Sequence, residues 1–330
     1  MKALIHEKKI GMEGLTYRET DTPEPGPGEV RVRLKTAGMN HRDLSILNRH
    51  QPDDPACIIG SDGAGVIEAA GTEVTAVSTG DEVIINPGLG WEKNSDAPPE
   101  GFEILGVPND GTFAEQIVIP AANVEPKPKH LSWQEAGVLA LPALTAYRVL
   151  FTRARVKPGD NVFIPGIGGG VATFLLQFAR AAGADVYVTS RSELKRKQAL
   201  ELGAMQAIDS HEDWSEALGG KKMDVVVESI GGATFNKSLS QLRRGGTMVT
   251  FGSSTDDNVE LNIRPFFYGQ YNLLGSTMGS TEELQEMLAF IKKYDIKPVM
   301  DQTYPLASYE QAFNRLHQAA QIGNIGFSMT

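Results

Sequence analysis

The order of apolar and polar residues separates a strand-rich part of the chain from a part in which strands and helices alternate. In residues 28–38, apolar side chains stand at every second position with basic ones between them, which predicts a strand with one face on a core and one in water. From Leu131 onward, short apolar runs alternate with segments of helical spacing, and two amphipathic segments, 281–294 and 308–319, close the chain. Such alternation is typical of parallel strands joined by crossover helices.

The clearest example of this alternation lies in residues 161–204. The segment begins with an apolar run, Val162–Pro165, that is short enough for a buried strand, and a glycine-rich turn follows it. Apolar residues then recur at helical spacing over Val171–Ala182, and Val186–Thr189 is typical of a second strand. Strand, glycine turn, helix and strand in this order predict the first half of a nucleotide-binding unit.

The glycine turn is the first candidate site. A phosphate bound at a helix N-terminus needs several backbone N–H groups pointing at it and no side chains in the way. We expect Gly166 to permit the tight turn, Gly169 and its neighbour Gly170 to let the backbone approach the phosphates, and Ala172 to let the helix pack on the strand. An ordinary turn is the alternative for such a pattern, but both flanks have the required strand and helix character.

The end of the second strand indicates which dinucleotide binds. A site for the unphosphorylated cofactor places an acidic residue there to hold the ribose hydroxyls. This chain has Ser190 and Arg191 instead, with Lys195 and Arg196 close behind. Cations favour a 2′-phosphate, so NADPH is the predicted cofactor. The alternative, that these residues only solvate the start of a helix, is disfavoured because cations there oppose the helix dipole.

The chain has 330 residues, of which 41% are hydrophobic, enough for two domains with ordinary cores. Its formal net charge of −10 argues against nucleic acid or an anionic membrane as the main partner. No run of about eighteen apolar residues occurs, and the N-terminus lacks the apolar core of a signal peptide. The single cysteine, Cys57, excludes an internal disulfide and a multi-cysteine zinc site. We expect a cytoplasmic protein that acts on a small molecule.

Several segments, in order and in spacing, resemble the medium-chain dehydrogenase/reductase superfamily over essentially the whole chain. Besides the glycine turn, they are PEPGPGEVRVRLKTAGMNHRDL, GSDGAGVIEAAGTEVTAVSTGDEVI, DGTFAEQIVIP, LPALTAYRVL, DVVVESIGG and GGTMVTFG. The resemblance implies an α/β protein in which a Rossmann domain with a doubly wound parallel sheet (residues 125–280) is inserted into a GroES-like β-rich catalytic domain (residues 1–124 and 281–330). The chain is most similar to the zinc-free branch, which contains quinone oxidoreductases and enone reductases.

The resemblance also locates the positions at which zinc-dependent members bind their metal. Those members carry a cysteine, a histidine–glutamate pair and a second cysteine where this chain has Asn40, Ser61, Asp62 and Leu141. Catalytic zinc needs about three good ligands, which this set does not supply. The segment 87–110, an expected excursion loop, also lacks the four cysteines of the structural zinc lobe. We predict no bound metal, with one alternative left open: a site of another kind built from His41, Asp43, His50 and Asp62.

Without a metal as Lewis acid, reduction of an activated acceptor is the easier chemistry. A quinone or an α,β-unsaturated carbonyl takes hydride at carbon while its charge spreads onto oxygen. The protein then needs hydrogen-bond donors near that oxygen and a proton source, a role that water can fill. The resemblance implies that Asn40 donates to the substrate oxygen and that Thr145 donates to the carboxamide of the nicotinamide.

Two histidines are candidates for the proton donor. His41 is the best titratable group in this region, and His50 lies in a charged segment expected near the cleft. Each also has a simpler interpretation, His41 as a structural residue and His50 as part of a solvated loop. Asp43 follows an expected strand end, where capping of the next helix is its favoured role.

Three residues near the ends of later strands complete the candidate site. Gly231, Gly252 and Ser253 lie where a doubly wound sheet binds its ligand, so we expect their backbone to contact the cofactor. The sequence as a whole predicts an NADPH-dependent reductase of quinones or conjugated carbonyls. Two alternatives stay open, a zinc-type alcohol dehydrogenase or aldehyde reductase and an NADPH-binding protein with little turnover. The resemblance further implies a homodimer, through the apolar edge around residues 266–274.

Overall fold

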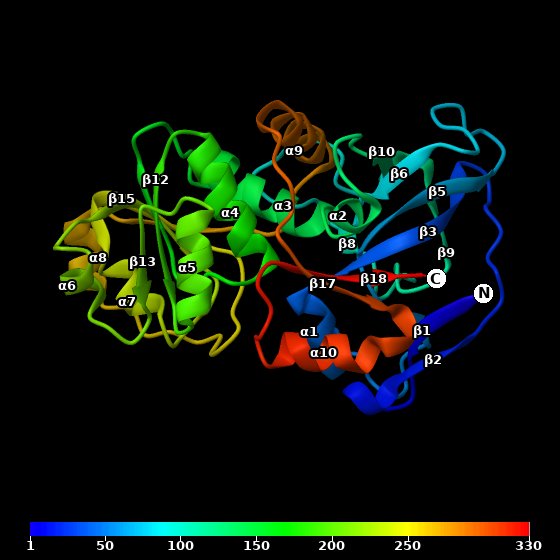
Figure 1. Ribbon diagram of the computed structural model, residues 1–330, viewed down its shortest axis with the longest axis horizontal. Helices are drawn as coiled ribbons and strands as arrows, with labels where there is room; N and C mark the ends of the chain where they lie inside the picture. Colours follow the sequence, from blue (N-terminus) through cyan, green and yellow to red (C-terminus); the bar gives the residue numbers. More distant parts are fainter. Residues whose placement is uncertain (330) are drawn as a thin grey trace. The chain divides into compact units, whose positions relative to one another are not determined.

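The computed structural model describes residues 1–329, which fold into two compact units (Figure 1). Unit 1 contains residues 1–142 together with the chain from Gly279 onward, and unit 2 contains Ala143–Met278. The sequence placed residues 125–142 with the second domain, whereas here they belong to unit 1. The physical reason is packing, because helix α2 (Trp133–Gly137) contacts strands β3, β5 and β18 of the unit 1 sheet.

Unit 1 is built around a seven-stranded sheet in which the strand order is β10-β6-β5-β3-β18-β17, with β9 also pairing with β3. A three-stranded sheet (β2-β1-β4) and a two-stranded ribbon (β7-β8) complete its strands. The strands are β1 (Lys2–His6), β2 (Leu15–Glu19), β3 (Glu29–Met39), β4 (Cys57–Ile58), β5 (Asp62–Ala70), β6 (Glu82–Ile85), β7 (Gly88–Leu89), β8 (Glu103–Ile104), β9 (Gln116–Pro120), β10 (Val124–Pro126), β17 (Met300–Pro305) and β18 (Asn324–Ser328).

The helices of unit 1 lie between these strands in the sequence. The predicted helix over 281–294 is confirmed with the same bounds, and the one predicted over 308–319 is shorter. The α-helices are α1 (His41–Arg49), α2, the first residues of α3 (Ala140–Tyr147), α9 (Thr281–Tyr294) and α10 (Tyr309–His317), and the 3-10 helices are η1 (Met12–Gly14), η2 (Ala121–Asn123) and η4 (Leu306–Ser308).

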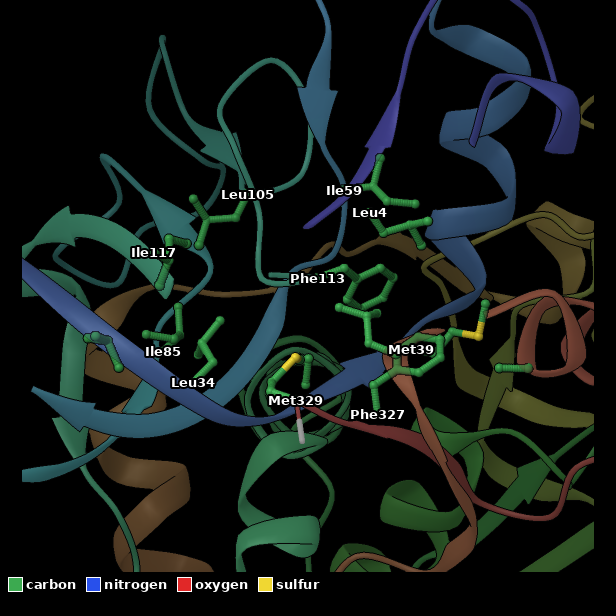
Figure 2. Close-up of a cluster of buried hydrophobic side chains, with 14 of the residues drawn as sticks. Leu4, Leu34, Met39, Ile59, Ile85, Leu105, Phe113, Ile117, Phe327 and Met329 are labelled. Atoms are coloured by element: carbon green, nitrogen blue, oxygen red, sulfur yellow. The ribbon is translucent and has the colours of Figure 1, made fainter. Parts of the chain in front are cut away.

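The core of unit 1 is one cluster of buried side chains, part of which is drawn in Figure 2. Its members come from strands β1, β2, β3, β5, β6, β9, β10, β17 and β18, from helices α1 and α10, and from the segments between them. Strand β3 shows the predicted alternation, since its apolar residues over 30–34 are buried and the basic residues between them are partly or fully exposed. Phe113 and Phe327 meet edge to face within the cluster, with ring centroids 4.9 Å apart. A Cβ on Gly60 would lie 2.3 Å from the Phe113 ring, so the chain can pass this ring only as glycine.

Replacing Phe113 with alanine tests the importance of this aromatic pair. The ring is 0% exposed, and its loss should lower the free energy of unfolding by about 3–5 kcal/mol. Denaturant titration followed by circular dichroism measures the change. Ile10→Ala, at a residue that is 49% exposed, serves as the control and should stay within about 0.5 kcal/mol. A Phe113→Ala loss as small as that of the control would contradict the placement of the core.

Unit 2 contains a six-stranded, all-parallel sheet with the strand order β13-β12-β11-β14-β15-β16. The chain runs outward from β11 to β13, returns to the centre and then runs outward again from β14 to β16. The strand order therefore reverses between β11 and β14, which confirms the predicted doubly wound sheet. The strands are β11 (Asn161–Ile164), β12 (Asp185–Ser190), β13 (Gln206–Asp209), β14 (Met223–Glu228), β15 (Leu242–Thr250) and β16 (Asn272–Gly275).

The helices of unit 2 pack on this sheet in two groups (Figure 1). Helices α4 and α5 contact β11, β12 and β13, and helices α7 and α8 contact β14 and β15. No helix within residues 1–329 is both long and apolar enough to cross a membrane. The helical segments are the end of α3, a π-helical turn (Arg148–Arg153), α4 (Gly170–Ala181), α5 (Glu193–Glu201), α6 (Trp214–Ala217), α7 (Phe235–Leu239) and α8 (Ile263–Gly269).

Candidate functional site

The glycine turn of unit 2 connects β11 to α4 and is tied to β12 by hydrogen bonds. The Gly166 N–H donates to Thr189 Oγ1 (3.0 Å), and the Ile167 N–H donates to the Thr189 carbonyl (2.8 Å). Gly166 has a φ of 77°, a left-handed conformation that favours glycine. A Cβ there would also lie 2.9 Å from Ile230 Cδ1, so the turn has room for glycine alone unless Ile230 moves.

Gly169 needs a different explanation. Its φ of −90° is open to any residue, and a Cβ built on it would meet no protein atom within 4 Å. Neither strain nor packing accounts for the glycine, and close approach of a ligand to the backbone stays the prediction for it. Helix α4 begins at Gly170, runs for 12 residues and has the half-buried Ala172 in its first turn. The N-terminus of a helix of this length attracts negative charge, so the turn fits a phosphate group.

Three of the basic residues that follow β12 were singled out by the sequence, and the structure separates them. Arg196 donates to Asp209 Oδ2 (2.8 Å), so its charge is compensated within the protein. Arg191 is exposed, and residues 1–329 offer its side chain no hydrogen bond or ion pair. A Cβ built on Gly168 would lie 2.9 Å from Lys195 Nζ, which shows that the Lys195 ammonium reaches the glycine turn. That Arg191 and Lys195 meet a phosphate stays a prediction.

The end of β12 contributes one more predicted residue, Ser190. Its side chain is 6% exposed, and its Oγ accepts a hydrogen bond from the Ser192 N–H (3.2 Å). No acidic residue ends this strand, and the acid that ends the neighbouring β13, Asp209, is paired with Arg196. The carboxylate that would hold an unphosphorylated ribose is thus missing from the strand end where it is expected.

Two strand-end loops, residues 229–234 after β14 and 251–256 after β15, contain the other predicted cofactor contacts. Gly231 has a φ of 96°, and a Cβ on it would lie 2.5 Å from Ser253 Oγ, so the two loops are closely packed there. A Cβ on Gly252 would find its nearest neighbour at 3.7 Å, an ordinary contact. The structure therefore explains the glycine at 231 by packing and leaves room for a side chain at 252.

The residue that organises the first of these loops, Glu228, is one that sequence reasoning missed. Its side chain is 0% exposed, and its Oε1 accepts from the Ile230 N–H (2.7 Å), the Gly231 N–H (3.1 Å) and the Thr234 hydroxyl (3.0 Å). The signal in the sequence was an acidic residue closing the apolar run Val225–Val227. Charged residues are rarely buried without a reason, so this position could have been singled out.

In unit 1, Asn40 stands at the start of α1 and is held by two buried acids. Its backbone N–H donates to Asp43 Oδ2 (2.7 Å), which gives Asp43 the helix-capping role that we predicted. Its side-chain amide donates to Asp62 Oδ2 (2.8 Å), and the Leu141 N–H donates to Asp62 Oδ1 (2.7 Å). The orientation of the Asn40 amide is thus fixed by Asp62, and one of its two N–H bonds is used.

The four positions that correspond to zinc ligands are bonded to the protein itself. Asn40 and Leu141 both donate to Asp62, and Ser61 donates from Oγ to the Leu105 carbonyl (2.8 Å). Arg42 Nη1 in turn donates to Ser61 Oγ (2.5 Å), which brings a cation to this position. An amide, a hydroxyl and a backbone N–H do not make a zinc site, so these residues do not fit the metal.

The alternative metal site does not assemble either. Within residues 1–329, no three His, Cys, Asp or Glu side chains lie close enough together to hold an ion. His50 is 4% exposed, and its Nδ1 lies 2.8 Å from His6 Nδ1 while its Nε2 lies 2.9 Å from the Pro55 carbonyl. This arrangement contradicts the proton-donor role predicted for His50, because both ring nitrogens are engaged within the protein.

The remaining predicted residues are divided between the two units. His41 lies in the first turn of α1, and desolvation by neighbouring protein lowers the pKa of its imidazole, which disfavours the protonated, proton-donating form of the ring. Thr145 lies on α3 in unit 2 with a side chain that is 6% exposed, whereas Asn40 belongs to unit 1. That Asn40 donates to the substrate oxygen and Thr145 to the carboxamide of the nicotinamide stays a prediction.

The buried acids of unit 1 make stability depend on pH. Burial raises the pKa of Asp62 to about 7, against the hydrogen bonds from Asn40 and Leu141, and burial raises the pKa of Asp43 to about 6. A carboxyl whose pKa is raised on folding stabilises the protein below its unfolded pKa of about 3.9. That contribution is lost as the pH rises through the folded pKa.

Asp62→Asn should remove part of this pH dependence. Between pH 4.5 and pH 8 the parent protein should lose roughly 2–4 kcal/mol more unfolding free energy than the variant, because only the parent ionises at this site. Denaturant titrations at the two pH values measure the difference. Identical pH dependence in both proteins would show that Asp62 is not the titrating group.

Known proteins resemble the chain in sequence. Residues 26–129 match the family described as "Alcohol dehydrogenase GroES-like domain", and residues 170–293 match the family described as "Zinc-binding dehydrogenase". A zinc-type alcohol dehydrogenase-like protein of Schizosaccharomyces pombe is 35% identical over 98% of each chain. A crotonyl-CoA reductase of Streptomyces collinus is 31% identical over 93% of this chain and 80% of that protein. A quinone oxidoreductase of Pseudomonas aeruginosa is 30% identical over 93% of each.

Solved structures resemble the whole fold. A crystal structure of an NAD-dependent alcohol dehydrogenase superimposes with a TM-score of 0.93 at 35% identity, covering 100% of both chains. A crotonyl-CoA carboxylase/reductase solved in complex with NADP superimposes with a TM-score of 0.91 at 25% identity, covering 99% of this chain and 94% of that one. These likenesses confirm a Rossmann-like domain combined with a GroES-like domain.

Proposed function

The chain belongs to the medium-chain dehydrogenase/reductase superfamily, and from that membership we propose that it reduces quinones or α,β-unsaturated carbonyls with NADPH and without catalytic zinc. The observation that carries the proposal is the hydrogen-bonded set of Asn40, Asp62 and Leu141, which stands where zinc-dependent members place their ligands. A site without a Lewis acid suits an acceptor that spreads its own negative charge.

The residues of unit 2 would hold the dinucleotide. The N-terminus of α4 and the glycine turn would bind the pyrophosphate, and Arg191 and Lys195 would bind the 2′-phosphate of the adenosine ribose. Thr145 would donate a hydrogen bond to the carboxamide of the nicotinamide. When bound, the cofactor supplies the hydride. The fit rests on the open space beside Gly169 and on the exposed Arg191 at a strand end that has no acid.

The residues of unit 1 would serve the acceptor. The Asn40 amide has a second N–H besides the one donated to Asp62, and this bond can meet the oxygen on which negative charge develops. Because Asp62 fixes the amide in place, the donor does not need to reorganise during the reaction. The lowered pKa of the His41 imidazole disfavours its proton-donating form, so we propose that water delivers the proton to the product.

The names of the relatives support an activated acceptor without deciding among substrates. Relatives are named for the reduction of crotonyl-CoA, of quinones and of 2-haloacrylate, which are conjugated electron acceptors. Others are named alcohol dehydrogenases, and one solved neighbour is named NAD-dependent, which keeps alcohol or aldehyde chemistry as the second candidate. The cytoplasmic location inferred from the sequence stays a prediction.

A substrate panel tests the proposed function. Purified protein would be mixed with NADPH or NADH and, in turn, a quinone, an enone, a 2-enoyl thioester, an α,β-unsaturated carboxylate and an aldehyde. We expect loss of NADPH absorbance with at least one quinone or conjugated carbonyl, at a rate that a chelator does not change. Stoichiometric zinc with activity lost on chelation would support the alcohol dehydrogenase instead. Tight NADPH binding with no turnover would support a binding protein.

Arg191→Ala tests the choice of cofactor. Losing one charge-assisted contact should weaken NADPH binding by about 1.5–3 kcal/mol and leave NADH binding nearly unchanged, because only NADPH carries the 2′-phosphate. Isothermal titration calorimetry gives both dissociation constants. Lys197→Ala, at another exposed cation of α5, is the matched control and should change neither constant by more than about twofold. Equal weakening of both cofactors would refute the assignment.

We also propose a homodimer that forms through the edge of the unit 2 sheet. Strand β16 is the last strand of that sheet, and Leu273 on it is 37% exposed. Ile263 and Phe267 on α8 are 62% and 49% exposed, so apolar side chains and unpaired backbone groups occur in the same region. These features are typical of a surface that another copy of the chain covers.

Leu273→Glu should shift the protein toward monomer, because a charge would then enter the buried contact. Light scattering coupled to size-exclusion chromatography measures the mass. Leu194→Glu, at a residue of α5 that is 60% exposed and lies away from this edge, is the control and should remain dimeric. A parent protein that is monomeric at micromolar concentration would contradict the homodimer.

A further inference from the structure

Glu228 is a buried carboxylate that has no cation beside it. Its side chain is 0% exposed at the end of β14, and no lysine, arginine or histidine within residues 1–329 forms an ion pair with it. Its Oε1 accepts three hydrogen bonds from the loop over 229–234, and its Oε2 accepts one from the Ser238 hydroxyl. These partners are neutral donors, which suit an ionised carboxylate because it can only accept. An ionised carboxylate at this place would be held by four hydrogen bonds and would have no cation to compensate its charge.

This charge lies where the strand order of the unit 2 sheet reverses. Strands β11 and β14 are neighbours, with Val162 paired to Val225 and Phe163 to Val226. The loops that follow them also meet, because a Cβ on Gly166 would lie 2.9 Å from Ile230 Cδ1. Doubly wound sheets bind their ligands in the crevice at this point, outside the carboxyl ends of the strands.

The two halves of a dinucleotide can be placed from the topology. The pyrophosphate belongs at the glycine turn between β11 and α4, and the adenosine ribose belongs at the end of β12, where Arg191 lies. The nicotinamide half must then extend in the opposite direction, over the ends of β14 and β15. Glu228 ends β14, so it is the buried charge on the nicotinamide side of the sheet.

We propose that Glu228 sets the balance between the two oxidation states of the bound cofactor, an inference that rests on the proposed nicotinamide-dependent function. Hydride transfer to the acceptor leaves a nicotinamide ring with one more positive charge than the reduced ring has. A fixed negative charge nearby favours the oxidised form and so favours hydride donation. The phosphates are the same in both forms, so their repulsion by Glu228 cancels when the two are compared. Glu228 is a positioning and electrostatic residue, because both of its carboxylate oxygens are engaged by the loop and by Ser238.

The size of the effect follows from Coulomb's law. A unit charge on the order of 10 Å from the ring, at an effective dielectric constant of roughly 20 to 40, changes the relative affinity about 4- to 16-fold. Glu228→Gln removes the charge while its amide can still accept from the Ile230 and Gly231 N–H groups and donate to Ser238. Ser238→Ala removes one hydrogen bond and keeps the charge, which makes it the matched control.

The experiment measures dissociation constants of NADP⁺ and NADPH for the whole chain by calorimetry. In Glu228→Gln the ratio of the NADP⁺ constant to the NADPH constant should rise about 4- to 16-fold over the parent. In Ser238→Ala both constants should change by the same factor. A parent-like ratio in Glu228→Gln, or an equal rise in Ser238→Ala, would overturn the proposal.

Two further readouts separate the possible failures. If Glu228→Gln does not fold, Glu228→Asp can still overturn the proposal, because it keeps the charge and shortens the side chain. Its ratio should match that of the parent even where both constants rise, and a changed ratio would overturn the proposal. A parent protein that binds neither nicotinamide form would refute the proposed function, whereas normal binding with an unchanged ratio refutes only the role of Glu228.

Discussion

A carboxylate that is removed from water needs hydrogen-bond donors in its place, and this constraint arranges the candidate site in each unit. In unit 1, Asp62 takes the side-chain amide of Asn40 and the backbone N–H of Leu141. In unit 2, Glu228 takes the backbone and hydroxyl donors of the loop after β14. Both carboxylates therefore fix the groups around them without any ligand. A side chain held in this way, such as the Asn40 amide with its second N–H, does not need to reorganise in order to stabilise developing charge.

The same constraint explains why the residues at the zinc positions do not fit the metal in a chain that matches a family named for zinc. Each of the residues at the four metal positions forms hydrogen bonds inside the protein. The Arg42 guanidinium donates to Ser61, so a positive charge of the protein lies in the region where a metal ion would otherwise supply positive charge. Reverting a single position to cysteine would break these bonds without supplying the other ligands.

Features with local causes could be predicted from the sequence. The alternation over 28–38 gave strand β3, and the helical spacing over 281–294 gave α9 with its bounds. The strand, glycine turn and helix around Gly166 are contiguous in the chain, so their arrangement follows from short-range geometry. The doubly wound sheet could be predicted for a related reason, since each parallel pair requires a crossover of its own.

Features that depend on distant residues could not be predicted. Leu141 and Asp62 are 79 residues apart in the sequence, and His6 and His50 are 44 residues apart. No local sequence pattern could therefore predict either contact. The sheet formed by β1, β2 and β4 escaped notice because its strands are short and come from separated segments. The same limit misplaced residues 125–142, whose helical character was visible but whose packing partner was not.

The contact between His6 and His50 limits which amino-acid substitutions each position can accept. The two Nδ1 atoms lie 2.8 Å apart, and the outer nitrogens lie 3.0 Å from the Gly11 carbonyl and 2.9 Å from the Pro55 carbonyl. Replacing one ring with an aliphatic side chain would leave Nδ1 of the other ring buried without its hydrogen-bond partner. Substitutions at the two positions are thus expected to occur as matched pairs, so descendants of this sequence should keep both imidazoles or neither.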